Sequence, residues 1–248
     1  MNTTHKIDTV LHLADSALIL AQRNGEWCAH GPILEQDIAI TNITLDLIGQ
    51  ARNFYQYATT LMSETEGKTE TEDTLAYLRN ESAYKNLLLC ELPNGDWGQT
   101  VLRQFFFSAF QQLLFEKIIN QNSDNHLTAI AAKAIKETQY HVKWSAEWVI
   151  RLGDGTEESK SRMYKALDAL WMYTGELFIP APFEIYDIAS LKEPWLKNIN
   201  AVLQEATLSV PADCFMQTGG KTGVHTEHLG FILSEMQYLQ RSYPGAEW

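Results

Sequence analysis

Hydrophobic positions along this chain recur at the three- and four-residue spacing of amphipathic helices. The pattern predicts helices over residues 5–22, 35–62, 74–90, 97–120, 133–152, 157–177, 189–208 and 224–243. Turn signals such as Asn24-Gly25, Asn94-Gly95 and Pro244-Gly245 separate several of these segments. Long helices joined by short connections predict an all-α bundle that forms one domain over residues 1–248.

The helix predicted over residues 133–152 carries the most informative pattern. Its apolar stripe includes Thr138 and His141, so both side chains are expected to face the helix's packing partner. In carboxylate-bridged di-metal bundles this inward position holds Glu-x-x-His. A threonine hydroxyl is a poor ligand for iron or manganese and cannot bridge two metals. The pattern therefore indicates a degenerate di-iron site.

The residues that precede the seven histidines test this interpretation. The residues three positions before each histidine are Asn2, Thr9, Trp27, Ser123, Thr138, Thr222 and His225. None is acidic, so the chain has no Glu-x-x-His, and it has no His-Glu-x-x-His zinc motif either. We therefore expect no metal in this chain. Ser123 or Asp124 is expected to cap the central helix.

Two further carboxylates lie near the degenerate positions. Asp46 is expected to face inward on the 35–62 helix, and Gly49, three residues later, can ligate nothing. A buried Asp46 needs a cation or hydrogen-bond donors. We therefore interpret it as part of a network of polar contacts in the core that takes the place of a metal. Glu137 and His141 can pair on one helix face, as a remnant ligand pair or, preferably, as a structural hydrogen-bonded pair.

His225 and His228 form the best remaining ligand cluster, because three-residue spacing places them on one face of the predicted 224–243 helix. A metal site there needs a further ligand from elsewhere, and a packed histidine is the simpler interpretation. The preceding Gly219-Gly220-Lys221-Thr222-Gly223 loop departs from the phosphate-loop motif at Phe215. It retains amides and Lys221 that can bind an anion.

Aromatic residues are more numerous on two predicted helices than one internal stripe requires. They are Phe105, Phe106, Phe107, Phe110, Trp144 and Trp148. The sequence leaves two interpretations open, a bulky core and a helix–helix interface with another subunit.

Composition narrows the class of protein further. The 248 residues are 45% hydrophobic, and the net charge is −12. This negative charge argues against nucleic acid as a partner. It also makes the chain a poor binder of the polyanionic coenzyme A unless a basic patch or another subunit contributes. No apolar run reaches the length of a membrane span, and no signal pattern is present, so we expect a cytoplasmic protein without membrane contact. Cys28, Cys90 and Cys214 are interpreted as buried thiols.

Five segments resemble a known family. They are NGEWCAHGP (24–32), LDLIGQARNFYQYA (45–58), NLLLCELPNGDW (86–97), KAIKETQYHVKWSAEWVIRLGDGT (133–156) and GGKTGVHTEHLGFILSEMQYLQRSYPGAEW (219–248). Together they resemble the C subunits of the bacterial ring 1,2-phenylacetyl-CoA epoxidases, multicomponent monooxygenases of phenylacetate breakdown. The match is weaker from Lys160 to Val210.

The resemblance implies a ferritin-like bundle with a degenerate, metal-free site, in which Asp46, Gly49, Thr138 and His141 stand at former ligand positions and Ser108 near another. It also implies a complex with a catalytic di-iron A subunit, with a small B subunit and with a reductase E subunit that uses NADPH, FAD and an iron–sulfur cluster. An acyl-CoA contact is expected at residues of two segments. These residues are Ala83, Tyr84, Lys85, Asn86, Ile185, Tyr186 and Asp187.

The sequence thus supports one main hypothesis, a non-catalytic structural subunit of such an epoxidase. A stand-alone metal-dependent oxidoreductase that uses His225 and His228 is the alternative from another class. A homodimeric helical module without a catalytic partner is a third possibility.

Overall fold

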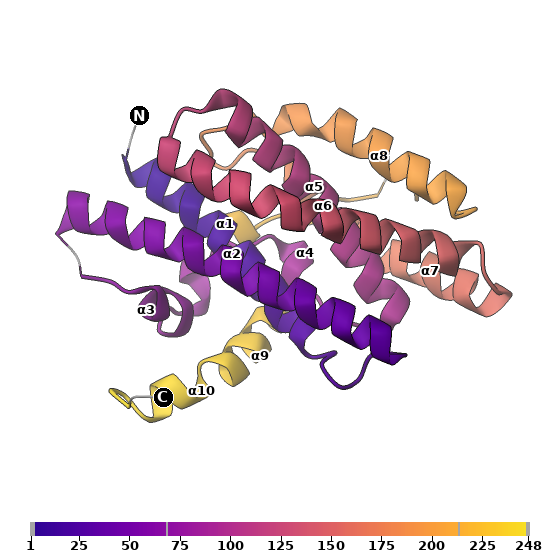
Figure 1. Ribbon diagram of the computed structural model, residues 1–248, viewed down its shortest axis with the longest axis horizontal. Coiled ribbons are helices and arrows are strands. Elements are labelled where there is room, and N and C mark those ends of the chain that lie inside the picture. The colour runs from indigo at the N-terminus through magenta and orange to yellow at the C-terminus, as the bar shows by residue number, and fades with distance from the viewer. Residues whose placement is uncertain (1–2, 68, 213, 247–248) are drawn as a thin grey trace. The chain divides into compact units, whose positions relative to one another are not determined.

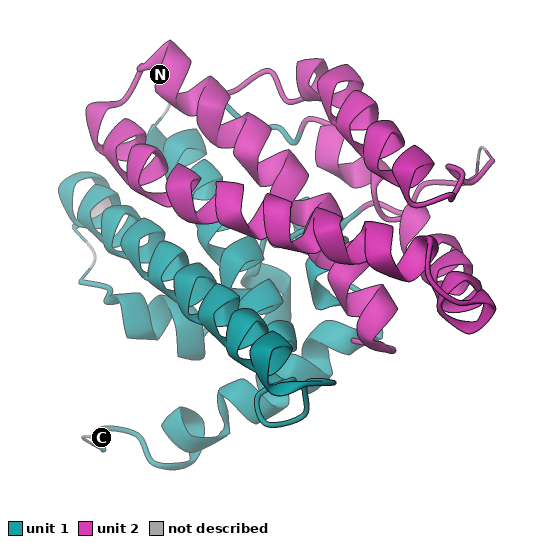
Figure 2. Ribbon diagram, turned by 45° about the vertical axis from the view of Figure 1, so that its right-hand side comes forward, with its two compact units in different colours: residues 1–93, 181–185, 219–248 teal, residues 94–180, 186–218 magenta. Residues whose placement is uncertain are grey.

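The structure is a computed structural model that describes residues 3–67, 69–212 and 214–246. Every regular element in these ranges is an α-helix or a 3-10 helix, which confirms the all-α prediction. No helix within them is both long and apolar enough to cross a membrane. The chain divides into two compact units, made of residues 1–93, 181–185 and 219–248, and of residues 94–180 and 186–218 (Figure 2). The single-domain expectation stays a prediction.

The first unit is organised around a helical hairpin. It consists of α1 (Thr3–Gly25) and α2 (Leu34–Glu66), which lie side by side along much of their length (Figure 1). The other elements of this unit are α3 (Glu72–Tyr77), η1 (Glu81–Ala83), α4 (Leu88–Glu91), η4 (Gly220–Thr222), α9 (Glu227–Met236) and α10 (Tyr238–Ser242). Segments from both ends of the chain therefore pack together in one unit.

The second unit is built on the hairpin of α5 (Trp97–Gln121) and α6 (Asn125–Gly153). It also contains α7 (Glu157–Trp171), η2 (Gly175–Phe178), η3 (Ala189–Leu191) and α8 (Lys192–Glu205). Asp124 caps α6 as predicted, because its carboxylate accepts hydrogen bonds from the backbone N–H groups of His126 and Leu127.

The aromatic residues of α5 form the core of the second unit. Phe105, Phe106, Phe107 and Phe110 are all buried, as is Trp144. The Phe106 ring lies 5.6 Å from that of Trp195, whose indole N–H donates to the Phe106 carbonyl oxygen. The bulky-core interpretation is therefore the correct one for these five residues.

Four predicted helices were too long. The 189–208 segment begins with the 3-10 helix η3 and is α-helical only over Lys192–Glu205. The 74–90 segment breaks after Tyr77, because Arg79 and the residues that follow it bond to partners outside a helix. The 157–177 segment ends as an α-helix at Trp171, where Thr174 donates to the Trp171 carbonyl and the chain turns. The 224–243 segment begins at Glu227, capped by Thr226, and divides at Gln237.

The cysteine interpretation was wrong for two of the three thiols. Cys90 is buried in α4, but Cys28 and Cys214 are exposed. Both exposed residues lie in connections between helices, where no apolar stripe predicts burial.

Candidate functional site

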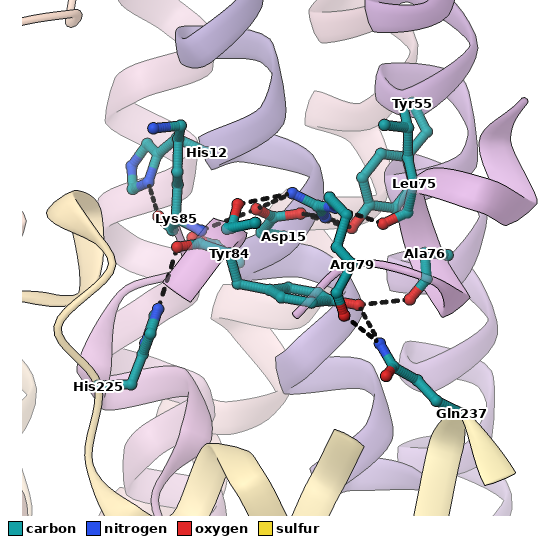
Figure 3. Close-up of polar contacts among 12 residues, drawn as sticks. His12, Asp15, Tyr55, Leu75, Ala76, Arg79, Tyr84, Lys85, His225 and Gln237 are labelled. Carbon is teal, nitrogen blue, oxygen red and sulfur yellow. Dashed lines mark hydrogen bonds and ion pairs between the residues drawn. The ribbon is translucent and has the colours of Figure 1, made fainter. Parts of the chain in front are cut away.

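The candidate site is a buried polar network in the first unit, centred on the extended segment from Tyr84 to Leu87 (Figure 3). An extended backbone makes no internal hydrogen bonds, so its polar groups need partners from elsewhere. The N–H of Lys85 donates to Asp15 at 2.8 Å, and the N–H of Leu87 donates to Ser16 at 3.2 Å. Both partners lie on α1, which therefore fixes one edge of the segment.

Two histidines bind the carbonyl groups of the same segment. His12 Nδ1 lies 2.6 Å from the Lys85 oxygen, and His225 Nε2 lies 3.0 Å from the Tyr84 oxygen. His12 comes from α1, and His225 comes from the loop before α9. The segment is thus held between the N-terminal helix and the C-terminal part of the chain.

Asp15 is the acidic centre of the network. It pairs with both terminal nitrogens of Arg79 and accepts a 2.5 Å hydrogen bond from the Tyr55 hydroxyl. The Arg79 guanidinium also lies 4.2 Å from the centre of the Tyr84 ring. Asp15 is fully buried. The Arg79 cation and the hydrogen-bond donors therefore offset the free-energy cost of burying its charge.

Burial sets the protonation of the two tyrosines. It raises the pKa of Tyr55 well above its ordinary value, and the Asp15 charge adds to that shift. Burial likewise raises the pKa of Tyr84 to about 12, despite the opposing charge of Arg79. Both hydroxyls therefore stay protonated at neutral pH and act as hydrogen-bond donors. Tyr84 donates to the Ala76 carbonyl and accepts from the Gln237 amide.

Glu91 anchors the C-terminal segment. Its carboxylate accepts hydrogen bonds from His225 Nδ1 at 2.9 Å, the Thr226 N–H at 2.6 Å and the Asn86 amide at 2.8 Å. Since His225 Nε2 faces the Tyr84 carbonyl, both ring nitrogens of His225 face acceptors, and the imidazolium form satisfies both. Burial opposes this charge, but the hydrogen bond to Glu91 and its charge prevail and raise the pKa of His225.

A third charged pair completes the network. Lys221 donates to both oxygens of Glu184, at 2.9 and 3.0 Å, and both side chains are buried. His12 Nε2 lies 3.8 Å from Glu184. Burial lowers the pKa of His12, and the Glu184 charge only partly offsets this effect. The neutral imidazole of His12, with its proton on Nδ1, therefore donates a hydrogen bond to the backbone carbonyl oxygen of Lys85.

The glycine-rich loop packs against this segment. A side chain at Gly220 would place its Cβ 2.2 Å from the Asn86 carbonyl oxygen, and one at Gly223 would approach the Ser82 carbonyl to 2.4 Å. The glycines thus permit close backbone contact. Lys221, the residue expected to attract an anion, has its charge neutralised by Glu184.

The expected acyl-CoA contacts fall in different surroundings. Ala83 is exposed, Tyr84 and Asn86 are fully buried, and the Lys85 ammonium lies 3.5 Å from Asp8 and over the Phe183 ring. Ile185 is half-buried in the first unit, whereas Tyr186 is buried and Asp187 is exposed in the second. Their contact with an acyl-CoA remains a prediction.

The four positions that the resemblance assigns to a former metal site fall in different units. On α2, Asp46 is half-buried and Gly49 is exposed. On α6, Thr138 and His141 are both fully buried, as predicted. Thr138 Oγ1 lies 3.0 Å from the Ala134 carbonyl and 3.2 Å from Gln111 Oε1. These residue types do not fit a di-iron centre, which needs bridging carboxylates. The pairing of Glu137 with His141 stays a prediction.

The described part of the chain contains no group of three His, Cys, Asp or Glu side chains arranged to hold a metal ion. The prediction that His225 and His228 share a helix face was wrong, because α9 begins at Glu227 and His225 precedes it. Both His225 nitrogens are used within the protein.

Sequence reasoning missed the roles of Asp15, Arg79, Glu91 and Glu184. One available signal was His12-x-x-Asp15, a polar pair inside the buried stripe of α1. The partners of Glu91 and Glu184 gave no local signal, since His225 lies 134 residues and Lys221 37 residues away.

The fold and these residues define an all-α protein of the ferritin-like class. The family model described as "Phenylacetic acid catabolic protein" matches residues 1–248. The chain is 47% identical over 246 residues to the C subunit of the 1,2-phenylacetyl-CoA epoxidase of Escherichia coli (strain K12), covering 96% of this chain and 97% of that protein. The chain therefore belongs to the phenylacetic acid catabolic protein family.

Proposed function

We propose that this chain is the C-type subunit of a phenylacetyl-CoA 1,2-epoxidase and acts in phenylacetate catabolism as a structural, non-catalytic component. The similarity to the Escherichia coli protein over nearly the whole of both chains carries this proposal. Thr138 and Gly49, which cannot supply bridging carboxylates at the former ligand positions, support the non-catalytic role.

The proposed partners are an A subunit with the di-iron centre, a B subunit, and a reductase E subunit with NADPH, FAD and an iron–sulfur cluster. In the complex, iron would supply the oxygen chemistry that converts the aromatic ring to an epoxide. The contribution of this chain is to hold its partner in the reactive geometry. The three charge-balanced buried pairs, Asp15–Arg79, Glu91–His225 and Glu184–Lys221, favour a rigid scaffold.

Metal analysis and turnover test this proposal. The chain is purified alone and after co-expression with a candidate A subunit, and iron is measured by elemental mass spectrometry. We expect iron and phenylacetyl-CoA oxidation in the co-complex and neither in the lone chain. The control Thr138→Val in this chain should leave the iron content of the co-complex unchanged. Stoichiometric iron and turnover in the lone chain would contradict the proposal.

A further inference from the structure

The chain contains two Asn-Gly pairs, Asn24–Gly25 and Asn94–Gly95. Such pairs are chemically labile, because glycine has no side chain to hinder attack by its backbone nitrogen on the preceding side-chain amide. The two pairs have different surroundings in the folded chain. This difference decides which of them can react.

Asn24–Gly25 is protected by its place in a helix. The two residues are the last of α1, and the Asn24 side chain is fully buried. A helical N–H points along the helix axis towards a carbonyl oxygen four residues earlier. The Gly25 nitrogen is therefore held away from the Asn24 amide, and we expect this pair to be stable in the folded chain.

Asn94–Gly95 lies in the irregular turn between α4 and α5, in the second unit. Gly95 is exposed and has a φ of 61°, and no hydrogen bond holds its N–H among the residues that the structure describes. Its backbone nitrogen is thus accessible to hydroxide and is free to lose its proton. This pair has the nucleophile that Asn24–Gly25 lacks.

The amide that this nitrogen would attack is contacted by a cation. The Arg103 guanidinium donates to Asn94 Oδ1, and Thr100 Oγ1 donates to the Asn94 backbone carbonyl at 3.0 Å. Asn94 is half-buried, whereas Arg103 is fully buried. A charged donor on an amide oxygen stabilises the oxyanion that forms when a nucleophile adds to the amide carbon. Arg103 is therefore placed to promote attack on the Asn94 side chain.

We propose that Asn94 is a site of spontaneous deamidation and that the aspartate which forms pairs with Arg103. The Gly95 nitrogen, after losing its proton to hydroxide, forms a bond to Asn94 Cγ. The bond from Cγ to Nδ2 then breaks, and ammonia leaves with a proton taken from water. Water opens the resulting cyclic imide at Cγ, which restores the main chain and leaves a side-chain carboxylate. The net change consumes water and releases ammonia, without an oxidant or a reductant.

The surroundings of Asn94 favour this product. A carboxylate at position 94 replaces a neutral acceptor of the buried Arg103 by a charged one. It also adds negative charge just before α5, which begins at Trp97, and the helix dipole favours negative charge there. Opening of the imide at the backbone carbonyl would instead lengthen the main chain in the turn that Thr100 holds. The inference does not depend on the epoxidase assignment.

Peptide mass spectrometry of the aged full chain provides the first test. The purified chain is incubated at mildly alkaline pH, in native buffer and in urea, and deamidation is followed at both pairs. In native buffer Asn94 should react at least about tenfold faster than Asn24, because only Asn24 is held in a helix. In urea, which removes the fold, the two rates should become similar. An Asn94 that reacts no faster than Asn24 in the native chain would overturn the proposal.

The contribution of Arg103 is tested with Arg103→Lys. This variant keeps the positive charge but loses the planar guanidinium, and it should slow deamidation of Asn94 by about tenfold. Circular dichroism verifies that the variant is folded, and the rate at Asn24 is its internal control. An unchanged or faster rate at Asn94 in the folded variant would show that Arg103 does not promote the reaction.

The pairing of the product is tested independently, because a variant of the buried Arg103 can fail to fold. Asn94→Asp should be at least as stable to urea as the wild type, and Asn94→Ser, which removes the amide without adding a charge, should be less stable. An Asn94→Asp chain that is less stable than Asn94→Ser would refute the pairing with Arg103. Chromatography of the aged native chain should yield more aspartyl than isoaspartyl peptide, and an isoaspartyl excess would contradict the proposed product.

Discussion

Both ring nitrogens of His225 face oxygen atoms, with Nδ1 2.9 Å from the Glu91 carboxylate and Nε2 3.0 Å from the Tyr84 carbonyl. One imidazole ring thus joins the loop before α9 to α4 and to the extended segment. The geometry predicts a stability that depends on the protonation of this single residue.

The first prediction concerns His225 and the loss of stability as the pH rises. The folded-state pKa of His225 is raised above the unfolded value of about 6.5. Its contribution to stability is therefore fully present below about pH 6.5 and is lost as the pH rises through the raised pKa. The difference in unfolding free energy between wild type and His225→Gln, measured in urea, should shrink over that range. A difference independent of pH would contradict the ion pair, and the exposed His5→Gln serves as the control.

His12 should show the opposite dependence. Burial lowers its folded-state pKa below about 6.5, so its contribution is present above that pH and is lost as the pH falls through the lowered pKa. Proton-detected NMR titration of the imidazoles can separate the two residues. We expect His225 to remain charged at a pH where His12 is already neutral, and the reverse order would refute both assignments.

Removal of one partner from the Asp15–Arg79 pair should be strongly destabilising. Asp15→Ala leaves Arg79 buried without its carboxylate and also removes the acceptor for Tyr55 and the Lys85 N–H. We expect a loss of about 3–5 kcal/mol in chemical unfolding. The double variant Asp15→Leu, Arg79→Met should lose less than the sum of the single effects. Additive losses would mean that the pair does not act as a unit.

Two glycine substitutions should have opposite effects. Gly220→Ala places a methyl group 2.2 Å from the Asn86 carbonyl oxygen, so the loop must move, at a cost of about 1–3 kcal/mol. Gly49→Ala has open space within α2 and should stabilise the chain by about 0.5–1 kcal/mol through helix propensity. Thermal unfolding compares the two, and a tolerated Gly220→Ala would argue against close packing of the loop.

Much of the fold was predictable because helices carry local signals. The spacing of apolar residues located both long hairpins, the position of Asp124 indicated its capping role, and the stripe through Thr138 and His141 predicted their burial. Each inference needed only residues within one or two helical turns. The family resemblance, quoted from five segments, agrees with the match over residues 1–248.

The network around Tyr84 was decided by tertiary structure alone. Arg79 lies beyond the end of α3 and pairs with Asp15, 64 residues away on α1. His225 lies before the start of α9 and pairs with Glu91, 134 residues away. Helical periodicity describes which side of a helix is apolar, but it does not specify which distant charges will meet. A buried charge is stable only beside its partner, so these long-range pairs emerge only when the chain is folded.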